Sequence, residues 1–237
     1  MSCHNEHTHS HSHSHSGDDS NNDHVPPIPT SSAQDLSKYI DTPRLTALNS
    51  DVPNSELSKL FIKSESEGGK YSLKSPVSSD LDAQLILNIP FTGYVKLYSI
   101  ILRTAGDEEQ CPKEIKVYKN AKDVDFDNER KPQFTITHPQ IGVLADDGKD
   151  QDLDDSNFVE HHLPRSSFQS TTNLTLFIQN NWADDEDESI KIFHIELRGQ
   201  FQSPLAKEPI ITLYEAAANP ADHKNLIASV NKNYSSI

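Results

Sequence analysis

The chain has 237 residues, enough for one domain of ordinary size with tails or for two small domains. Its formal net charge of −15 at pH 7 argues against nucleic acid or an anionic membrane as partner, because both bind basic surfaces. The two cysteines, Cys3 and Cys111, form no CxxC motif and suggest no disulfide framework, so a reducing compartment fits best.

The N-terminus has no hydrophobic segment of the kind found in signal peptides, and no apolar run approaches membrane-spanning length. We therefore expect a soluble intracellular protein.

Residues 1–33 are of low complexity, and we expect them to be disordered because they contain too little apolar surface to offset the entropy lost on ordering. The histidines that open this tail are His4, His7, His9, His11, His13 and His15. Neutral imidazoles on a flexible chain can chelate zinc or nickel. Because nothing fixes the number or geometry of ligands, we favour a solvated tail with at most weak, adventitious zinc binding. No fixed metal site and no cofactor is predicted.

The folded part is expected to begin near Asp35. Residues 35–49 predict one or two short helical turns, with Pro43 at a first helical position. A second small apolar cluster follows within residues 57–62, and residues 71–77 predict a short strand.

The most apolar stretch runs from Leu85 to Leu102, where apolar side chains alternate as they do along a strand. Gly93 marks a turn or bend, which we attribute to the conformational freedom of glycine. The alternation changes parity at Ser99, which indicates either a β-bulge or a strand buried on both faces. This stretch is the expected core.

Further strand-like segments, separated by polar loops, are residues 114–119, 158–164, 174–178 and 190–197. Phe126, Phe134 and Ile136 mark additional inward contacts, and no long helix is indicated. Short alternating strands separated by polar loops predict an all-β sandwich. Periodicity alone does not separate a simple sandwich from a jelly roll.

Two acidic runs invite a calcium interpretation. An EF-hand loop that starts at Asp150 would need Gly and Glu where Asp155 and His161 stand, so the motif fails twice. We interpret residues 146–155 as a solvated acidic loop, and residues 184–188 as an acidic hairpin tip between two strands.

The histidines within the domain do not form a metal or catalytic motif. His161 and His162 are neighbours on a strand, so their side chains point to opposite faces and cannot share one ion. His194 lies between Phe193 and Ile195, where a structural histidine is expected. No nucleophile elbow, P-loop or dinucleotide fingerprint is present, so no catalytic residue is predicted and we do not expect an enzyme.

Three stretches carry a family resemblance: NIPFTG at 88–93 followed by VKL at 95–97, VYKN at 117–120, and YEAAANPADH at 214–223. Together with LRG at 197–199, they resemble the PITH domain, the proteasome-interacting module at the C-terminus of certain thioredoxin-like proteins. The order and spacing of these stretches agree with that family from about Ile40 to His223.

The resemblance implies a jelly-roll β-sandwich of the galactose-binding-domain-like type, present in cytoplasm and nucleus, with the 26S proteasome as partner. It suggests a division into a disordered His/Ser-rich tail (1–33), a PITH sandwich (34–216) and a C-terminal extension (217–237). The redox activity of the two-domain relatives does not carry over, because this chain lacks a CxxC motif.

Six residues in the matched stretches are candidate partner contacts: Arg198, Tyr214, Asn219, Pro220, Asp222 and His223. Arg198 could offer its guanidinium to a carboxylate of the partner, or equally hold the acidic loops of its own domain. Asp222 and His223 could likewise pair locally.

The sequence thus predicts a non-catalytic protein-interaction module that binds the 26S proteasome or a related large intracellular complex. Two alternatives stay open. One is zinc buffering through the His-rich tail. The other is a jelly roll that binds carbohydrate or another small ligand, with Trp182 as its candidate stacking residue.

Overall fold

The computed structural model describes residues 28–62, 75–121, 123–128, 130–144 and 157–205. The chain divides into one unit that ends at Ser203 and a second that begins at Pro204, and the fold below is that of the first. The predicted disorder of residues 1–27, the strand at residues 71–73 and most of the acidic loop at 146–155 lie outside the described residues.

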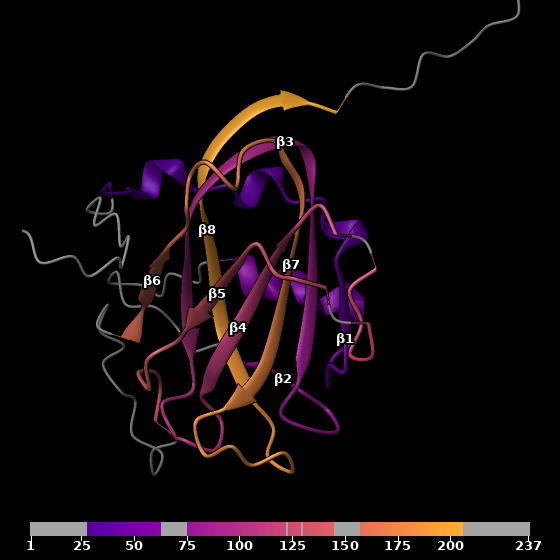
Figure 1. Ribbon diagram of the computed structural model, residues 1–237, viewed down its shortest axis with the longest axis vertical. Helices are drawn as coiled ribbons and strands as arrows, with labels where there is room; N and C mark the ends of the chain where they lie inside the picture. Colours follow the sequence, from indigo (N-terminus) through magenta and orange to yellow (C-terminus); the bar gives the residue numbers. More distant parts are fainter. Residues whose placement is uncertain (1–27, 63–74, 122, 129, 145–156, 206–237) are drawn as a thin grey trace, which may run out of the picture. The chain divides into compact units, whose positions relative to one another are not determined.

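The described elements are short 3₁₀ turns followed by antiparallel strands (Figure 1). The turns are η1 (Ser32–Gln34), η2 (Ser37–Tyr39), η3 (Thr42–Arg44) and η4 (Asn54–Phe61). The strands are β1 (Thr46–Leu48), β2 (Val77–Ser78), β3 (Leu85–Thr104), β4 (Pro112–Lys119), β5 (Phe134–Thr137), β6 (Val159–His162), β7 (Thr171–Asn181) and β8 (Lys191–Pro204). No helix in the described ranges is long and apolar enough to cross a membrane.

Strand β3 belongs to both layers of the sandwich. Its first half pairs with β1 and β7, and β7 continues through β4 to β5. Its second half pairs with β6 and lies beside β8, which in turn pairs with β2. The hydrogen-bonded path β2-β8-β3-β7-β4-β5 therefore folds over at β3 and buries its inner faces against each other. This confirms the predicted all-β fold of the jelly-roll type.

The parity change along β3 has the physical cause that the sequence suggested. Val95 and Leu97, at odd-numbered positions, belong to the core, and so do Ile100 and Leu102, at even-numbered positions. The inward-facing side of the strand therefore shifts by one residue between Leu97 and Ile100. Ser99 is also fully buried. The strand is thus irregular at Ser99 and buried on both faces beyond it.

Gly93 is needed for a different reason than the one expected. No left-handed backbone angle occurs there, and β3 bends without a tight turn, with a register shift against β7 between Pro90 and Val95. A Cβ at Gly93 would lie 2.4 Å from the carbonyl oxygen of Ser203 and 2.5 Å from the ring of Phe201. Gly93 therefore allows β8 to pass closely over the bend.

The N-terminal elements differ from the prediction in two places. The helical turns expected within residues 35–49 appear as η2 and η3, with Pro43 in the first turn of η3, but residues 46–48 form strand β1. Pairing of β1 with β3 outweighs local helical preference there. The predicted second apolar cluster also does not exist as a separate one, because Leu57, Leu60 and Phe61 join the main core.

The prediction that the acidic run at residues 184–188 is a hairpin tip is wrong. It connects β7 to β8, and these strands lie on opposite sides of β3 rather than beside each other.

The predicted inward contact of Phe126 is not made with the main core. Phe126 packs edge to face on Phe177 in a smaller apolar cluster.

We predict that Gly199→Ala destabilises the fold. A Cβ there would lie 2.2 Å from the carbonyl oxygen of Lys96 and 2.9 Å from Leu36 Cδ1, so β3 and β8 would have to separate. We expect the free energy of unfolding in urea to fall by about 2–3 kcal/mol. Gly106→Ala is the matched control, because its closest contact is 3.0 Å and its loss should be smaller. Equal losses in the two variants would contradict this account of Gly199.

Candidate functional site

Arg198 lies in a cluster of polar side chains that joins four separate segments. Its Nε donates to Glu196 Oε1 at 2.8 Å, and its Nη1 donates to Thr30 Oγ1 at 3.0 Å and lies 3.7 Å from Glu160 Oε2. Glu160 also accepts hydrogen bonds from Thr30 and, at 2.5 Å, from Ser99. We call Thr30, Ser99, Glu160, Glu196 and Arg198 the Arg198 cluster.

Strand pairing positions the cluster. Ser99 on β3 and Glu160 on β6 share one face because Ser99 pairs with His162 and Ile101 pairs with Glu160. The segment before η2 reaches β8 through a backbone bridge between Asp35 and Arg198, and through a 2.9 Å hydrogen bond from Leu36 N to Leu197 O. Thr30 is brought to Arg198 by this attachment.

The buried charges of the cluster are paired with opposite charges. The Glu196 side chain is 4% exposed and that of Arg198 is 17% exposed. Burial by itself would raise the pKa of Glu160, but hydrogen bonds from Ser99 and Thr30, together with the charge of Arg198, outweigh it and hold the pKa below its ordinary value of 4.5. Glu160 is therefore a carboxylate at neutral pH, and Arg198 is its counter-ion.

Arg198 is the one candidate partner residue that falls in the described ranges, and the structure shows its contacts within the domain. Its guanidinium contacts carboxylates of its own domain, but on strands β6 and β8 rather than in the acidic loops. Its contact with a partner stays a prediction. The other candidates, Tyr214, Asn219, Pro220, Asp222 and His223, and the histidines of the tail lie outside the described residues. Residues 28–33, assigned above to the tail, are described, and Thr30 contacts the sandwich.

Two histidines far apart in sequence form a pair between the layers. His138 Nδ1 and His161 Nε2 are 2.7 Å apart, and His138 Nε2 lies 3.0 Å from Thr104 Oγ1. One of the two facing nitrogens must carry a hydrogen and the other must accept it, so the pair is stable only when it is not fully protonated. His162 points to the opposite face, as the sequence predicted.

Burial keeps this pair neutral. Desolvation, with a smaller contribution from His161, lowers the pKa of His138 from 6.5 to about 4. Desolvation, with a smaller contribution from His162, lowers the pKa of His161 to about 4 as well. Both imidazoles are therefore uncharged at pH 7.

Cys111 lies near this pair but is chemically inert. Its side chain is fully buried, and burial raises the pKa of its thiol above the ordinary value. A thiol that stays protonated and inaccessible is a poor nucleophile.

A groove of about 510 Å³ runs between the η1–η2 segment and strands β3 and β8. We call it the aromatic groove; its lining includes Asp35, Lys38, Tyr39, Tyr98, Gln200 and Phe201. The rings of Tyr39 and Phe201 stack 4.2 Å apart. Tyr98 donates to Gln200 Oε1 at 3.2 Å, and the Arg165 guanidinium lies 4.0 Å from the centre of the Tyr98 ring. The groove thus offers both aromatic faces and polar groups.

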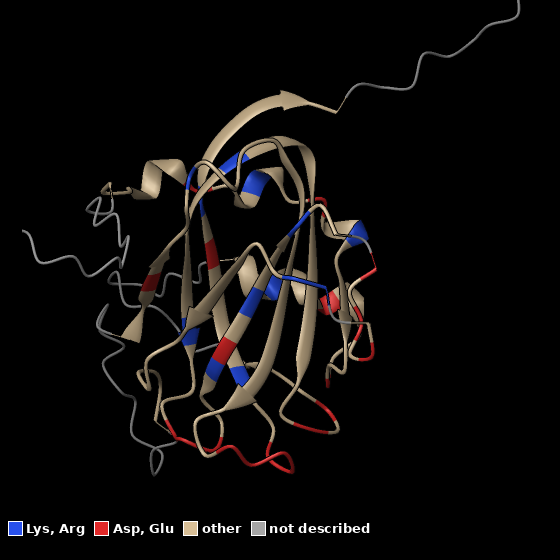
Figure 2. Ribbon diagram, viewed as in Figure 1, with Lys and Arg blue, Asp and Glu red and all other residues tan. Residues whose placement is uncertain are grey.

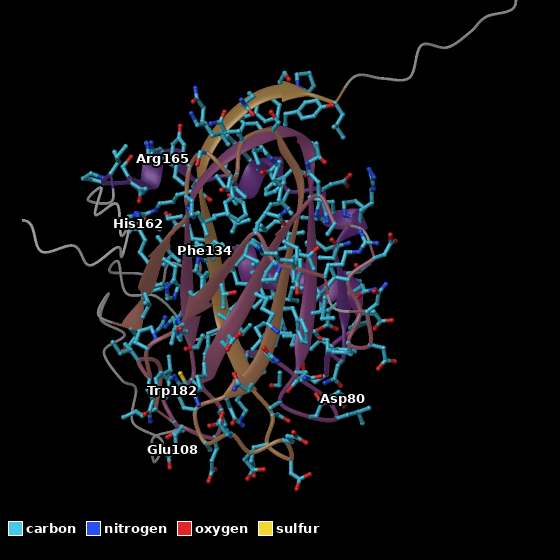
Figure 3. All side chains as sticks on the ribbon, viewed as in Figure 1. Asp80, Glu108, Phe134, His162, Arg165 and Trp182 are labelled. Carbon is cyan, nitrogen blue, oxygen red and sulfur yellow. The ribbon has the colours of Figure 1, made fainter. Side chains whose placement is uncertain are left out.

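Acidic residues gather in the loops β2–β3, β3–β4 and β7–β8, at the lower end of the sandwich in Figure 2. Asp184 in the last of these loops is held by Lys113 at 2.7 Å and by Asn180 at 3.0 Å. Within the described ranges, no group of three or more His, Cys, Asp or Glu side chains could hold a metal ion. Asp80 and Glu108, labelled in Figure 3, lie at this end.

Trp182, the candidate carbohydrate-stacking residue, lies at the same end and is half-buried. Its Nε1 donates to His138 O at 3.0 Å, and Lys113 Nζ lies 5.7 Å from the centre of its ring. The hydrogen bond ties the indole to the loop after β5.

Sequence reasoning missed the histidine pair and the aromatic groove. His138 follows β5 and His161 lies in β6, and no spacing rule links them. The groove combines residues from the N-terminal turns with residues of β3 and β8. Among the described residues that carry the family resemblance, Gly199 is the one that lines the groove.

Comparison with protein families matches residues 26–218 to the PITH domain. A PITH domain-containing protein of Caenorhabditis elegans is 32% identical over 208 residues, which cover 86% of this chain and 90% of that protein. PITH domain-containing protein 1 of Homo sapiens and that of Mus musculus are both 36% identical, over 151 and 149 residues. Each of these two matches covers 62% of this chain and 63% of the relative.

Solved structures give weaker matches. CBM32-3 of a family 31 glycoside hydrolase from Clostridium perfringens has a TM-score of 0.39 at 11% identity, covering 69% of this chain and 97% of that one. The F5/8 type C domain of a Bacteroides fragilis protein has a TM-score of 0.40 at 10% identity, covering 70% and 97%. Both TM-scores lie below 0.5, so nothing about ligands follows from them.

We predict that Arg198→Ala destabilises the fold, because it leaves the buried Glu196 carboxylate without this counter-ion. The free energy of unfolding should fall by about 3 kcal/mol. The double variant Glu196→Gln/Arg198→Met removes both charges at similar volume and should lose less. Urea unfolding of the three proteins measures this, and wild-type stability of Arg198→Ala would show that the cluster does not support the fold.

We also predict that acidification destabilises the fold between pH 6.5 and 4. In this window the unfolded chain binds protons at His138 and His161 that the folded chain does not, so the free energy of unfolding falls as the pH falls. The contribution of His138 alone is roughly 2–3 kcal/mol. Glu160, with its lowered pKa, contributes to the loss only below about pH 4.5.

Urea unfolding at several pH values tests this prediction. His161→Gln should flatten the pH dependence because it removes one of the two titrating groups, whereas His162→Gln, the control on the opposite face of β6, should change it less. A free energy of unfolding that does not vary between pH 6.5 and 4.5 would contradict the prediction.

Proposed function

The chain belongs to the PITH domain family, a family of protein-interaction modules, and on this premise we propose that it binds the 26S proteasome without catalysing a reaction. The observation that carries the proposal is the family match over residues 26–218, which includes all of the described residues. The resemblance of the segments at 88–97, 117–120 and 214–223 supports the same partner.

The state of the reactive side chains supports a role without catalysis. The thiol of Cys111 is buried and held protonated. The histidine pair is neutral at pH 7, but both facing nitrogens and His138 Nε2 are occupied by internal hydrogen bonds. A general base needs a nitrogen within hydrogen-bond reach of a substrate proton, and this arrangement uses those nitrogens for packing the layers together.

The candidate partner residues divide at the end of the family match. Tyr214 lies within the matched range, whereas Asn219, Pro220, Asp222 and His223 lie just beyond residue 218. We propose that this C-terminal run contributes to the contact with the proteasome, and that the protein acts in the cytoplasm and nucleus, where that partner occurs.

We predict that the full chain, used as bait at physiological salt, recovers 26S proteasome subunits from cell lysate. Mass spectrometry identifies the recovered proteins. Tyr214→Ala and His223→Ala should recover less proteasome than the wild type, and Tyr234→Ala, a tyrosine outside the matched range, serves as the control. If no proteasome subunit is recovered under conditions that recover known binders, the proposed partner is wrong.

A further inference from the structure

We propose that the aromatic groove binds an extended, acidic peptide segment of a protein partner. The inference rests on the proposed function, because it names the part of the domain that would take hold of a partner and the chemistry of what is held. Ring faces, an open strand edge and local positive charge lead to it independently.

Aromatic rings form the apolar part of a lining that also carries polar side chains. Tyr39 and Phe201 stack with an interplanar angle of 13°, and both are only partly buried. Tyr98 is 8% exposed, and its hydroxyl donates to Gln200. Grooves lined by aromatic rings with a few hydrogen-bonding groups favour proline and aliphatic side chains on extended peptides.

The edge of β8 gives the groove a place for a peptide backbone. Strand β2 pairs with this edge at Ile192 and Lys191, and the N-terminal segment reaches it at Leu197 and Arg198. Among the described residues, no further strand pairs with this edge at residues 199–201, which line the groove. An unpaired edge is where an added extended chain continues a sheet.

Basic side chains around the groove select the charge of the peptide. Lys38 is exposed and lies 5.0 Å from the centre of the Tyr39 ring, and Arg165 covers the Tyr98 ring. Lys96 precedes Tyr98 by two residues on β3, and so lies towards the same face. The acidic loops lie at the opposite end of the sandwich, as Figure 2 shows. Carboxylates of a partner therefore meet their most favourable charges at the groove.

One carboxylate lies among the described lining residues and opposes this selection. The side chain of Asp35 accepts hydrogen bonds from Ser37 N at 3.0 Å and from Ser37 Oγ at 2.7 Å, so the turn at η2 already occupies both of its oxygens.

The chain itself shows how a proline-containing segment lies beside these residues. Arg165 donates from Nη2 to the carbonyl oxygen of Ile28 at 3.3 Å while its guanidinium stacks on Tyr98. Ile28 precedes Pro29, which biases it towards an extended conformation. Lys38 beside the Tyr39 ring places a donor next to a ring face in the same way, within the groove itself.

Binding is tested with the full chain and a fluorescein-labelled peptide of the sequence EDEPLPLPDE, followed by fluorescence anisotropy. The charge-reversal variant Lys38→Glu/Lys96→Glu should weaken binding by about tenfold or more, since it reverses two favourable charges. Tyr39→Leu, which removes one ring of the stack, should weaken it by several-fold. The matched control Lys59→Glu/Lys131→Glu changes the net charge equally away from the groove and should stay within about twofold of the wild type. Circular dichroism establishes that each variant is folded.

Three results would each overturn the proposal. The first is equal binding of a peptide in which lysines replace the acidic residues. The second is an equal loss of affinity in the groove variant and the matched control. The third is tighter binding of a ten-nucleotide oligothymidine than of the acidic peptide, which would make the basic residues a nucleic-acid contact.

The lysate capture separates this proposal from the proposed function. If the wild type recovers proteasome but does not bind the acidic peptide, the groove assignment is wrong and the function stands. If the peptide binds through the groove but no proteasome is recovered, the groove assignment stands and the partner is a different one.

Discussion

The whole fold depends on one strand that serves two sheets. β3 holds β1 and β7 along its first half, and β6 and β8 along its second. This is possible only because the strand bends between Pro90 and Val95 and because Gly93 leaves room for Phe201 of β8 to cross the bend. The aromatic groove and the Arg198 cluster both lie against the second half, so their positions follow from that bend.

Local patterns predicted the strands well because burial of alternate side chains is a property of the strand itself. Residues 85–102, 114–119 and 174–178 lie within observed strands, and residues 190–197 do so from Lys191 onward. Errors arose where pairing with a distant segment decided the outcome. Residues 46–48 became a strand because β3 lies beside them, and residues 184–188 join two strands that do not pair. Neither pairing arrangement can be predicted from residues that are close in the sequence.

The candidate sites were harder to predict for the same reason. Arg198 is a candidate because of a family resemblance, but its neighbours Glu160 and Thr30 lie 38 and 168 residues away in the sequence. His138 and His161 meet because a loop and a short strand are packed into one gap between layers, and burial then sets their protonation. Long-range packing determines these contacts, and the spacing of apolar residues along the chain does not predict it.

The attachment of the N-terminal segment to β8 has a consequence for how the domain is made. Thr30 and Leu36 contact β8, so these contacts of the N-terminal segment cannot form on a ribosome until the region around Arg198 has left the exit tunnel. Such a high separation between contacting residues slows folding and favours completion after synthesis of nearly the whole domain. During that interval β3 lacks its pairing with β8, so part of its apolar surface stays exposed to solvent.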